Sequence, residues 1–191
     1  MVPKSTDRFS GERPPRRVPK PLDAARLEEL ALAYVARFAT SAAKLEGYLR
    51  RKLRERGWEG EGAAPLAELV ERFVAAGYVD DEAFARSRSG SLLRRGFGRR
   101  RIDQALNAAG IDADVRQAVR AGAGEQRQAA LAFVRKRRFG PFGPAETERA
   151  VREKQLAAML RAGHPLDSAR ELVNAVSIEA AEAWADAAPE D

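Results

Sequence analysis

Arginine side chains gather in one segment of the chain, LLRRGFGRRRI (92–102). Two glycines inside it are expected to interrupt the helix, so that one helix ends and the next begins within a cluster of five arginines: Arg94, Arg95, Arg99, Arg100 and Arg101. Arginine at a helix start opposes the helix dipole, at a cost of about 0.3 kcal/mol or more per charge. A bound anion would reverse that cost, because free backbone N–H groups and guanidinium groups would converge on it. The segment therefore predicts phosphate binding, with a solvated arginine-rich surface as the alternative.

A second basic cluster, made of Arg135, Lys136, Arg137 and Arg138, precedes Phe139 and Gly140 and resembles the first. We expect it to bind anions in the same way. The basic residues of 50–56 differ, because they are spread around a helix and alternate with apolar leucines. That distribution is typical of a solvated helix face.

Residues able to carry out catalysis are scarce. The chain has one histidine, His164, and no cysteine, which excludes a disulfide framework and a thiolate metal site. Neighbouring acids such as Asp80 and Asp81 are explained as helix caps, and no glycine-rich phosphate loop follows a strand. The sequence thus predicts a protein that is not an enzyme and that needs no metal or cofactor.

The basic clusters lie within a repeat. Gly57, Gly110 and Gly163 recur at a fixed interval of 53 residues, and each ends an apolar segment of helical periodicity. The segments are YLRRKLRERGW (48–58), RIDQALNAAGI (101–111) and KQLAAMLRAGH (154–164). His164 occupies the position of Trp58 and Ile111, so packing after a helix end is its expected role.

Further apolar segments flank each repeated glycine, and they predict three helices in each copy. An aromatic residue precedes each glycine at Tyr34, Phe84 and Phe133, and a third helical face follows it. No alternating strand pattern of useful length occurs. We expect an all-α protein of tandem three-helix modules, and stacked modules of this kind usually offer long binding surfaces.

The predicted division is a disordered basic arm (1–22), module 1 (23–79), module 2 (80–123), module 3 (124–176) and an acidic tail (177–191). Residues 81–140 carry fourteen basic and six acidic side chains, whereas residues 171–191 carry six acidic side chains and no basic one. No apolar run approaches the roughly 18 residues that cross a bilayer, and the N-terminus lacks the apolar core of a secretion signal. These features predict a cytoplasmic protein without a membrane partner.

Several segments together resemble the RecX family of recombinase regulators. They are AAGYVDDEAFARS (75–87), RRGFGRRRIDQAL (94–106), LRRKLRERGW (49–58), and LAFVRKRRFG (131–140) with AMLRAGHPLDSARELV (158–173). The resemblance covers roughly residues 27–175 and is most specific at Gly-Tyr-Val-Asp-Asp-Glu-x-Phe-Ala.

The resemblance implies an elongated, curved array of three-helix modules that binds the RecA–DNA filament in its groove. Such proteins limit filament growth and inhibit the ATPase, strand-exchange and coprotease activities of RecA. By position, Tyr78, Asp80, Asp81 and Phe84 would join modules 1 and 2. Arg95, Arg99, Arg100 and Arg101 would lie on the contact face. The implied partners are the RecA filament and the phosphate backbone of single- and double-stranded DNA, bound by a monomer.

The sequence departs from the family pattern at a few positions. Lys44 stands where an acid usually completes the capping box begun by Ser41, Arg99 replaces a common proline, and His164 replaces an aromatic residue. Two other functions stay open: a nucleic-acid-binding helical protein that acts without RecA, and a helical scaffold with Trp58, Phe139 and Phe142 as anchors for another partner.

Overall fold

The computed structural model describes residues 20–144 and 148–187, and in these two ranges the regular elements are helices. In chain order they are α1 (Ala24–Val35), α2 (Ala42–Arg56), α3 (Leu66–Ala75), α4 (Asp81–Arg94), α5 (Arg99–Asn107), α6 (Ala113–Ala118), α7 (Ala123–Arg137), the 3-10 helix η1 (Gly140–Phe142), α8 (Arg149–Arg161), α9 (Leu166–Val173) and α10 (Ile178–Asp186). The all-helical class expected from the sequence is confirmed. Among the described helices, none has the length and apolar character needed to cross a membrane.

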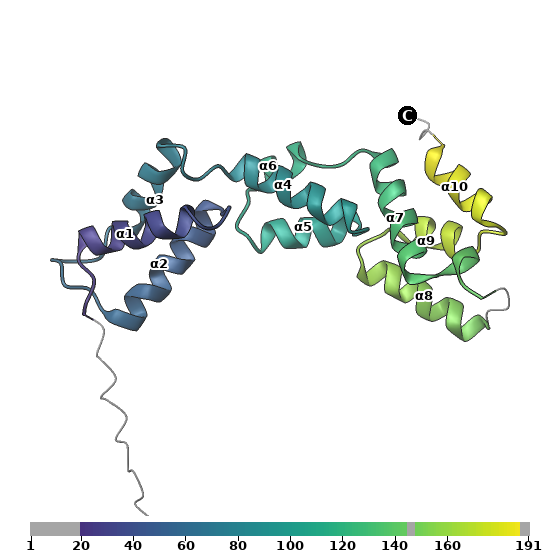
Figure 1. Ribbon diagram of the computed structural model, residues 1–191, viewed down its shortest axis with the longest axis horizontal. Helices are drawn as coiled ribbons and strands as arrows, with labels where there is room; N and C mark the ends of the chain where they lie inside the picture. The colour runs from purple at the N-terminus through teal and green to yellow at the C-terminus, as the bar shows by residue number, and fades with distance from the viewer. Residues whose placement is uncertain (1–19, 145–147, 188–191) are drawn as a thin grey trace, which may run out of the picture.

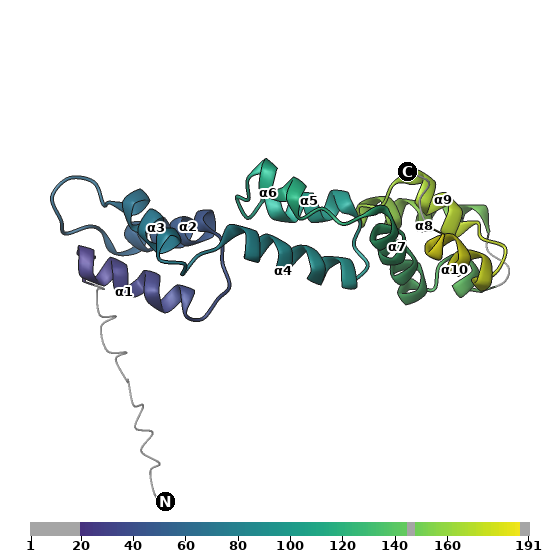
Figure 2. The same ribbon diagram turned by 90° about the horizontal axis from the view of Figure 1, so that it is seen from above.

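The helices form three groups in a row, which gives the molecule an elongated shape (Figure 1 and Figure 2). The groups are α1–α3, α4–α6 and α7–α10, and each has its own core of buried apolar side chains. Leu106 and Met159 lie inside the second and third cores with 1% and 0% of their surface exposed. Their equivalent Leu53 packs against the first core. The repeat therefore corresponds to a repeated core.

Local signals in the sequence account for the helix boundaries. Asp80 accepts a hydrogen bond from the N–H of Ala83 at 2.8 Å and caps α4, and Asp23 and Ser177 cap α1 and α10 in the same way. At the other ends, Gly110 and Gly163 have φ values of +73° and +96°. Only glycine adopts this left-handed conformation at low cost, as the sequence predicted.

The C-terminal region differs from its description as an acidic tail. Residues 178–186 form α10, which packs along α7, and Ala181 and Ala185 are 1% and 2% exposed within the third core. The third group therefore has four α-helices where three were expected. The acidic residues of this segment predict a solvated tail, but the small apolar residues between them provide one buried helix face. Residues 188–191 lie outside the described residues.

The N-terminal boundary also differs. The predicted arm included Leu22, but this side chain is fully buried in the first core. The N–H of Leu22 donates to the Gly57 carbonyl at 3.0 Å, and the Leu22 carbonyl accepts from the N–H of Glu59 at 2.9 Å. The first group of helices therefore includes Leu22, which precedes α1. Residues 1–19 of the predicted arm lie outside the described residues.

Candidate nucleic-acid interface and module joints

The arginines of the first cluster flank the joint between the second and third groups of helices. There the N-terminal end of α5 meets the C-terminal end of α8. The N–H of Gly98 donates to the Ala162 carbonyl at 2.9 Å, and the N–H of Arg100 donates to the Gly163 carbonyl at 3.2 Å. Because the positive end of one helix dipole faces the negative end of the other, the contact is favourable in sign.

Glycines allow the two backbones to approach at this joint. A Cβ atom added to Gly98 would overlap the carbonyl group of Gly163, and one added to Gly163 would overlap the backbone of Arg101. Gly96 is similarly constrained, because its Cβ atom would lie 2.9 Å from the backbone nitrogen of Phe133 in α7. The glycines that interrupt the arginine cluster thus serve close packing between modules as well as helix termination.

His164 lies inside the same joint. Its side chain is 4% exposed, its ring lies 5.6 Å from the ring of Phe133, and its Nε2 atom lies 3.0 Å from the Gly96 carbonyl oxygen. Since a carbonyl oxygen only accepts, Nε2 carries the proton and donates. Burial lowers the pKa of His164, and the hydrogen bond to Gly96 opposes that shift. The packing role expected for this residue agrees with its position, and the hydrogen bond adds a polar link between the two groups.

This geometry changes the interpretation of the start of α5. The sequence suggested that free N–H groups and guanidinium groups would converge on an anion, but the N–H groups of Gly98 and Arg100 are already bonded to α8. The three arginine side chains at the start of α5 remain exposed. An anion would therefore be held by the guanidinium groups and not by a free helix terminus.

Contacts of the individual arginines separate those with partners from those without. Arg99 approaches Asp103 at 3.8 Å, and the guanidinium of Arg95 lies 5.3 Å from the centre of the Phe97 ring. In the described part of the chain, Arg94, Arg100 and Arg101 form no ion pair. Their exposed positive charge is free to meet an external anion.

The second cluster, at residues 135–138, does not repeat the arrangement of the first. Its members occupy the last turn and cap of α7, where cations favour the helix dipole, and no α-helix starts directly after them. Arg135 forms an ion pair with Glu182 of α10, and the guanidinium of Arg137 lies 5.7 Å from the centre of the Phe133 ring. Arg138 adopts a left-handed conformation with φ +56°. Lys136 and Arg138 are exposed.

The joint between the first and second groups brings together the equivalent helix ends, the start of α2 and the end of α5, but through different contacts. The Ser41 hydroxyl at the start of α2 donates to the Ala109 carbonyl at the end of α5, at 2.5 Å. Asp81 accepts from the N–H of Ala42 at 2.9 Å. An acid from the next group of helices thus satisfies one of the free N–H groups in the first turn of α2, which differs from the N–H that a capping-box acid would accept from.

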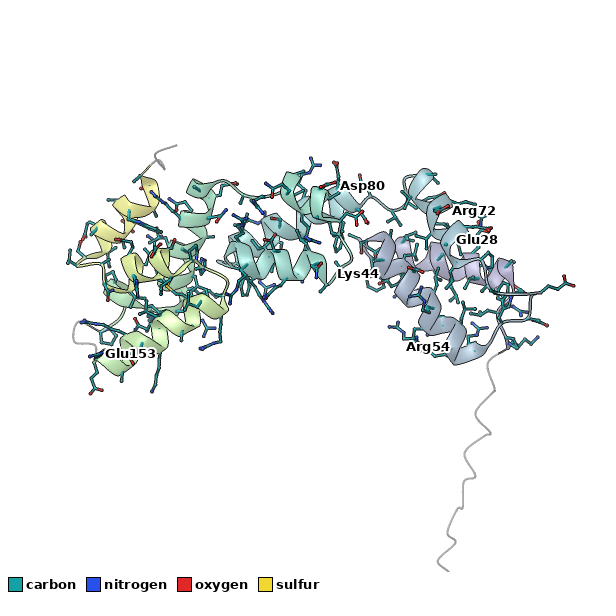
Figure 3. The ribbon with its side chains drawn as sticks, turned by 180° about the vertical axis from the view of Figure 1, so that it is seen from behind. Glu28, Lys44, Arg54, Arg72, Asp80 and Glu153 are labelled. Carbon is teal, nitrogen blue, oxygen red and sulfur yellow. The ribbon has the colours of Figure 1, made fainter. Side chains whose placement is uncertain are left out.

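Of the four residues expected to join the first two modules, two make contacts across the joint. Asp81 caps α2, and the Phe84 ring lies 5.0 Å below the Nζ atom of Lys44. Figure 3 shows Lys44 between the two groups of helices and Asp80 at the start of α4. Asp80 caps its own helix, and the ring of Tyr78, 58% exposed, packs on Phe73 within the first group.

Sequence reasoning missed the contacts that set both joints, which involve Ser41, Ala109, Ala162 and the three glycines Gly96, Gly98 and Gly163. The fixed interval between Gly110 and Gly163 was the available signal. That interval predicts helix termination, but it also marks a contact, because Ala109 and Ala162, one residue before each glycine, both offer their carbonyls to the preceding module.

Comparison with known proteins identifies the family. The family model for the second three-helix domain of RecX matches residues 80–119. A regulatory protein RecX from Myxococcus xanthus (strain DK1622) is 33% identical over 172 residues, covering 85% of this chain and 91% of the relative. The chain belongs to the RecX family of regulatory proteins.

Other RecX proteins are similar over much of the chain. One from Mycobacterium sp. (strain JLS) is 30% identical over 154 residues, covering 76% of this chain and 81% of the relative. The crystal structure of RecX from Lactobacillus salivarius superposes with a TM-score of 0.61 at 15% identity, covering 80% of this chain and 95% of that one. The similarity to the Lactobacillus structure supports the fold, and the similarity to the Mycobacterium protein supports a regulatory role typical of RecX.

Proposed function

We propose that this protein binds the RecA–DNA filament and restrains its recombinase, ATPase and coprotease activities during DNA repair and recombination. The observation that carries the proposal is membership of the RecX family over most of the chain. The implied effect is inhibition of filament growth. DNA phosphates and RecA would contact the protein together.

The arginine surface supports the DNA part of this proposal. Arg94, Arg100 and Arg101 are exposed beside the joint between the second and third groups, and their guanidinium groups match phosphate geometry. Lys136 and Arg138 add exposed positive charge on the third group. Because the modules form an elongated row, exposed cationic side chains can be presented along the length of one molecule. Such a molecule could contact several sites on the repeated surface of a filament.

A binding experiment separates this proposal from plain DNA binding. Fluorescently labelled single-stranded DNA, naked or coated with RecA, is titrated with the protein at increasing salt. Phosphate binding alone loses affinity with a log–log slope of about −0.7 per phosphate contact on single strands. A filament binder keeps a preference for RecA-coated DNA at moderate salt. Equal affinity for naked and coated DNA at every salt concentration would favour a nucleic-acid-binding protein that acts without RecA.

We further infer that the protein is a cytoplasmic monomer and that it acts by binding, without catalysing a reaction. The burial of His164 at a structural joint, with its hydrogen bond to Gly96, supports the last point. Analytical ultracentrifugation of the purified protein tests the monomeric state, and a dimer at micromolar concentration would overturn it.

A further inference from the structure

The first group of helices carries an aromatic cluster that its core does not fully explain. The rings of Tyr34 and Tyr48 stack with centroids 4.2 Å apart and planes 16° apart. The ring of Phe38, in the loop between α1 and α2, lies 5.3 Å from that of Tyr34. Tyr34 and Tyr48 pack against the first core, but Phe38 does not belong to it and is 53% exposed. Folding therefore accounts for two of the three rings.

Positive charge surrounds this cluster. The guanidinium of Arg51 and the ammonium of Lys52 lie 5.5 Å and 5.9 Å from the centre of the Tyr48 ring. Lys44, one turn before Tyr48 on α2, extends over Phe84 toward the second group of helices, and Arg37 is exposed directly beside Phe38 in the chain. Two cations therefore lie against the Tyr48 ring, and two more exposed cations are close to the cluster along the chain.

Acidic groups near the cluster neutralise it only in part. Glu55 lies 2.6 Å from Lys52 and 3.7 Å from Arg51, so that one carboxylate is shared by two cations. The hydrogen bond from Lys52 lowers the pKa of Glu55, which is therefore ionised at neutral pH. Neither Arg37 nor Lys44 forms an ion pair with any residue that the structure describes. The net charge around the rings is positive.

We propose that Phe38, backed by Tyr34 and Tyr48, is a stacking site for unpaired nucleobases, with Arg37, Arg51 and Lys52 holding the adjoining phosphates. Exposed aromatic faces beside cations are what proteins use to bind single strands without sequence preference, since every base has a flat face. A duplex hides those faces, so this site selects single-stranded nucleic acid. An apolar protein surface would gain from Phe38 but not from the surrounding cations. The proposal rests on the DNA contact in the proposed function, but it requires no RecA.

The test compares two probes that differ only in their bases: an oligothymidylate and an abasic oligonucleotide with the same number of phosphates. Affinities are measured by fluorescence anisotropy for the full chain without RecA. Replacing Phe38 by Ala is expected to weaken binding to oligothymidylate about fivefold or more, because one base stack contributes ~1 kcal/mol or more. Binding to the abasic probe should not change. Phe38→Trp should retain the affinity for oligothymidylate, since a larger ring still stacks.

Val74→Ala is the matched control, because Val74 is an exposed apolar residue of α3, 47% exposed, that forms no part of the aromatic cluster. Circular dichroism checks that all three variants keep native helicity. Equal affinities of the native protein and Phe38→Ala for oligothymidylate would overturn the proposal, as would an equal loss on both probes. If Phe38→Ala binds both probes normally but binds RecA-coated DNA less tightly, the ring contacts protein and the stacking site is wrong. Failure of RecA binding in every variant would instead count against the proposed function.

Discussion

His164 shows how one residue position changes role between copies of a repeat. The equivalent Ile111 is 1% exposed in the second core and Trp58 packs against the first, whereas His164 joins two groups of helices through Gly96. Burial lowers the pKa of His164, and the hydrogen bond to the Gly96 carbonyl opposes that shift without reversing it. The imidazole is therefore neutral in the folded protein.

This environment predicts a pH dependence of stability. The folded-state pKa of His164 lies below its unfolded value of about 6.5, so as the pH falls below that value the unfolded chain binds a proton that the folded protein does not. Stability from this group is complete above the unfolded pKa and is lost as the pH falls through the interval below it. Urea unfolding of the native protein and of His164→Gln, measured on both sides of about pH 6.5, should show a larger loss in the native protein. The same loss in both proteins would contradict the account, because Gln can donate to Gly96 but does not titrate.

The arginines at the start of α5 provide a second prediction at the residue scale. Replacing Arg100 and Arg101 by Glu should abolish binding to RecA-coated DNA while leaving the fold intact, because both side chains are exposed and have no ion-pair partner among the described residues. Glu at a helix start also suits the dipole. Binding is measured by anisotropy and folding by circular dichroism. Arg72→Glu serves as a control, since Arg72 lies on α3 and pairs with Glu28 (Figure 3). Retained binding by the folded double variant would show that this surface is not the contact.

Helix termini were predictable because their signals are local. Asp80 as a cap and Gly110 and Gly163 as left-handed ends follow from short-range chemistry. The resemblance pointed to Asp81 and Phe84 at the first joint, but the backbone contacts of the joints were not predictable, because a carbonyl such as that of Ala162 gains its partner from a residue far along the chain. The arginine cluster was visible in the sequence itself. The sequence did not reveal that hydrogen bonds to the end of α8 already occupy N–H groups at the start of α5.

Close contact between α5 and α8 predicts the effect of adding one methyl group at the joint. Gly98→Ala should destabilise the protein by about 1–3 kcal/mol, because its Cβ atom would overlap the Gly163 carbonyl group and the backbones would have to separate. Gly124→Ala is the control, since a Cβ atom there meets no neighbour within 4 Å. Urea denaturation measures both variants. If Gly98→Ala and Gly124→Ala are equally stable, the two helix ends do not meet as described.

The packing of α10 against the third core predicts that this helix stabilises the fold, which a solvated tail would not do. Trp184 packs against the third core, and the guanidinium of Arg127 lies 5.2 Å from the centre of its ring. Trp184→Ala should therefore reduce the free energy of unfolding by about 2 kcal/mol, less than the 3–5 kcal/mol of a fully buried Trp because the side chain is half-buried. A loss that is too small to resolve by urea denaturation would indicate that α10 is detached in solution.

At the scale of the whole molecule, the second α-helix of each group meets the second α-helix of the next group end to end. α8 contacts the start of α5, and α5 contacts the start of α2. The joint between the second and third groups adds packing of Gly96 against α7 and the buried His164, whereas the joint between the first and second rests on Ser41, Asp81 and Lys44. We expect the joint between the first and second groups to be the more flexible of the two. The first group of helices could then adjust to a curved partner.

The most direct test of the proposed function is the single-strand-stimulated ATPase of RecA, measured while this protein is titrated into the reaction. A filament modulator should inhibit hydrolysis at well below one copy per RecA subunit, because it acts at filament ends or at sparse sites in the groove. Unchanged hydrolysis while the protein still binds DNA would contradict the account. Inhibition that appears only when the protein saturates the DNA would contradict it as well, since competition for phosphates would then be sufficient.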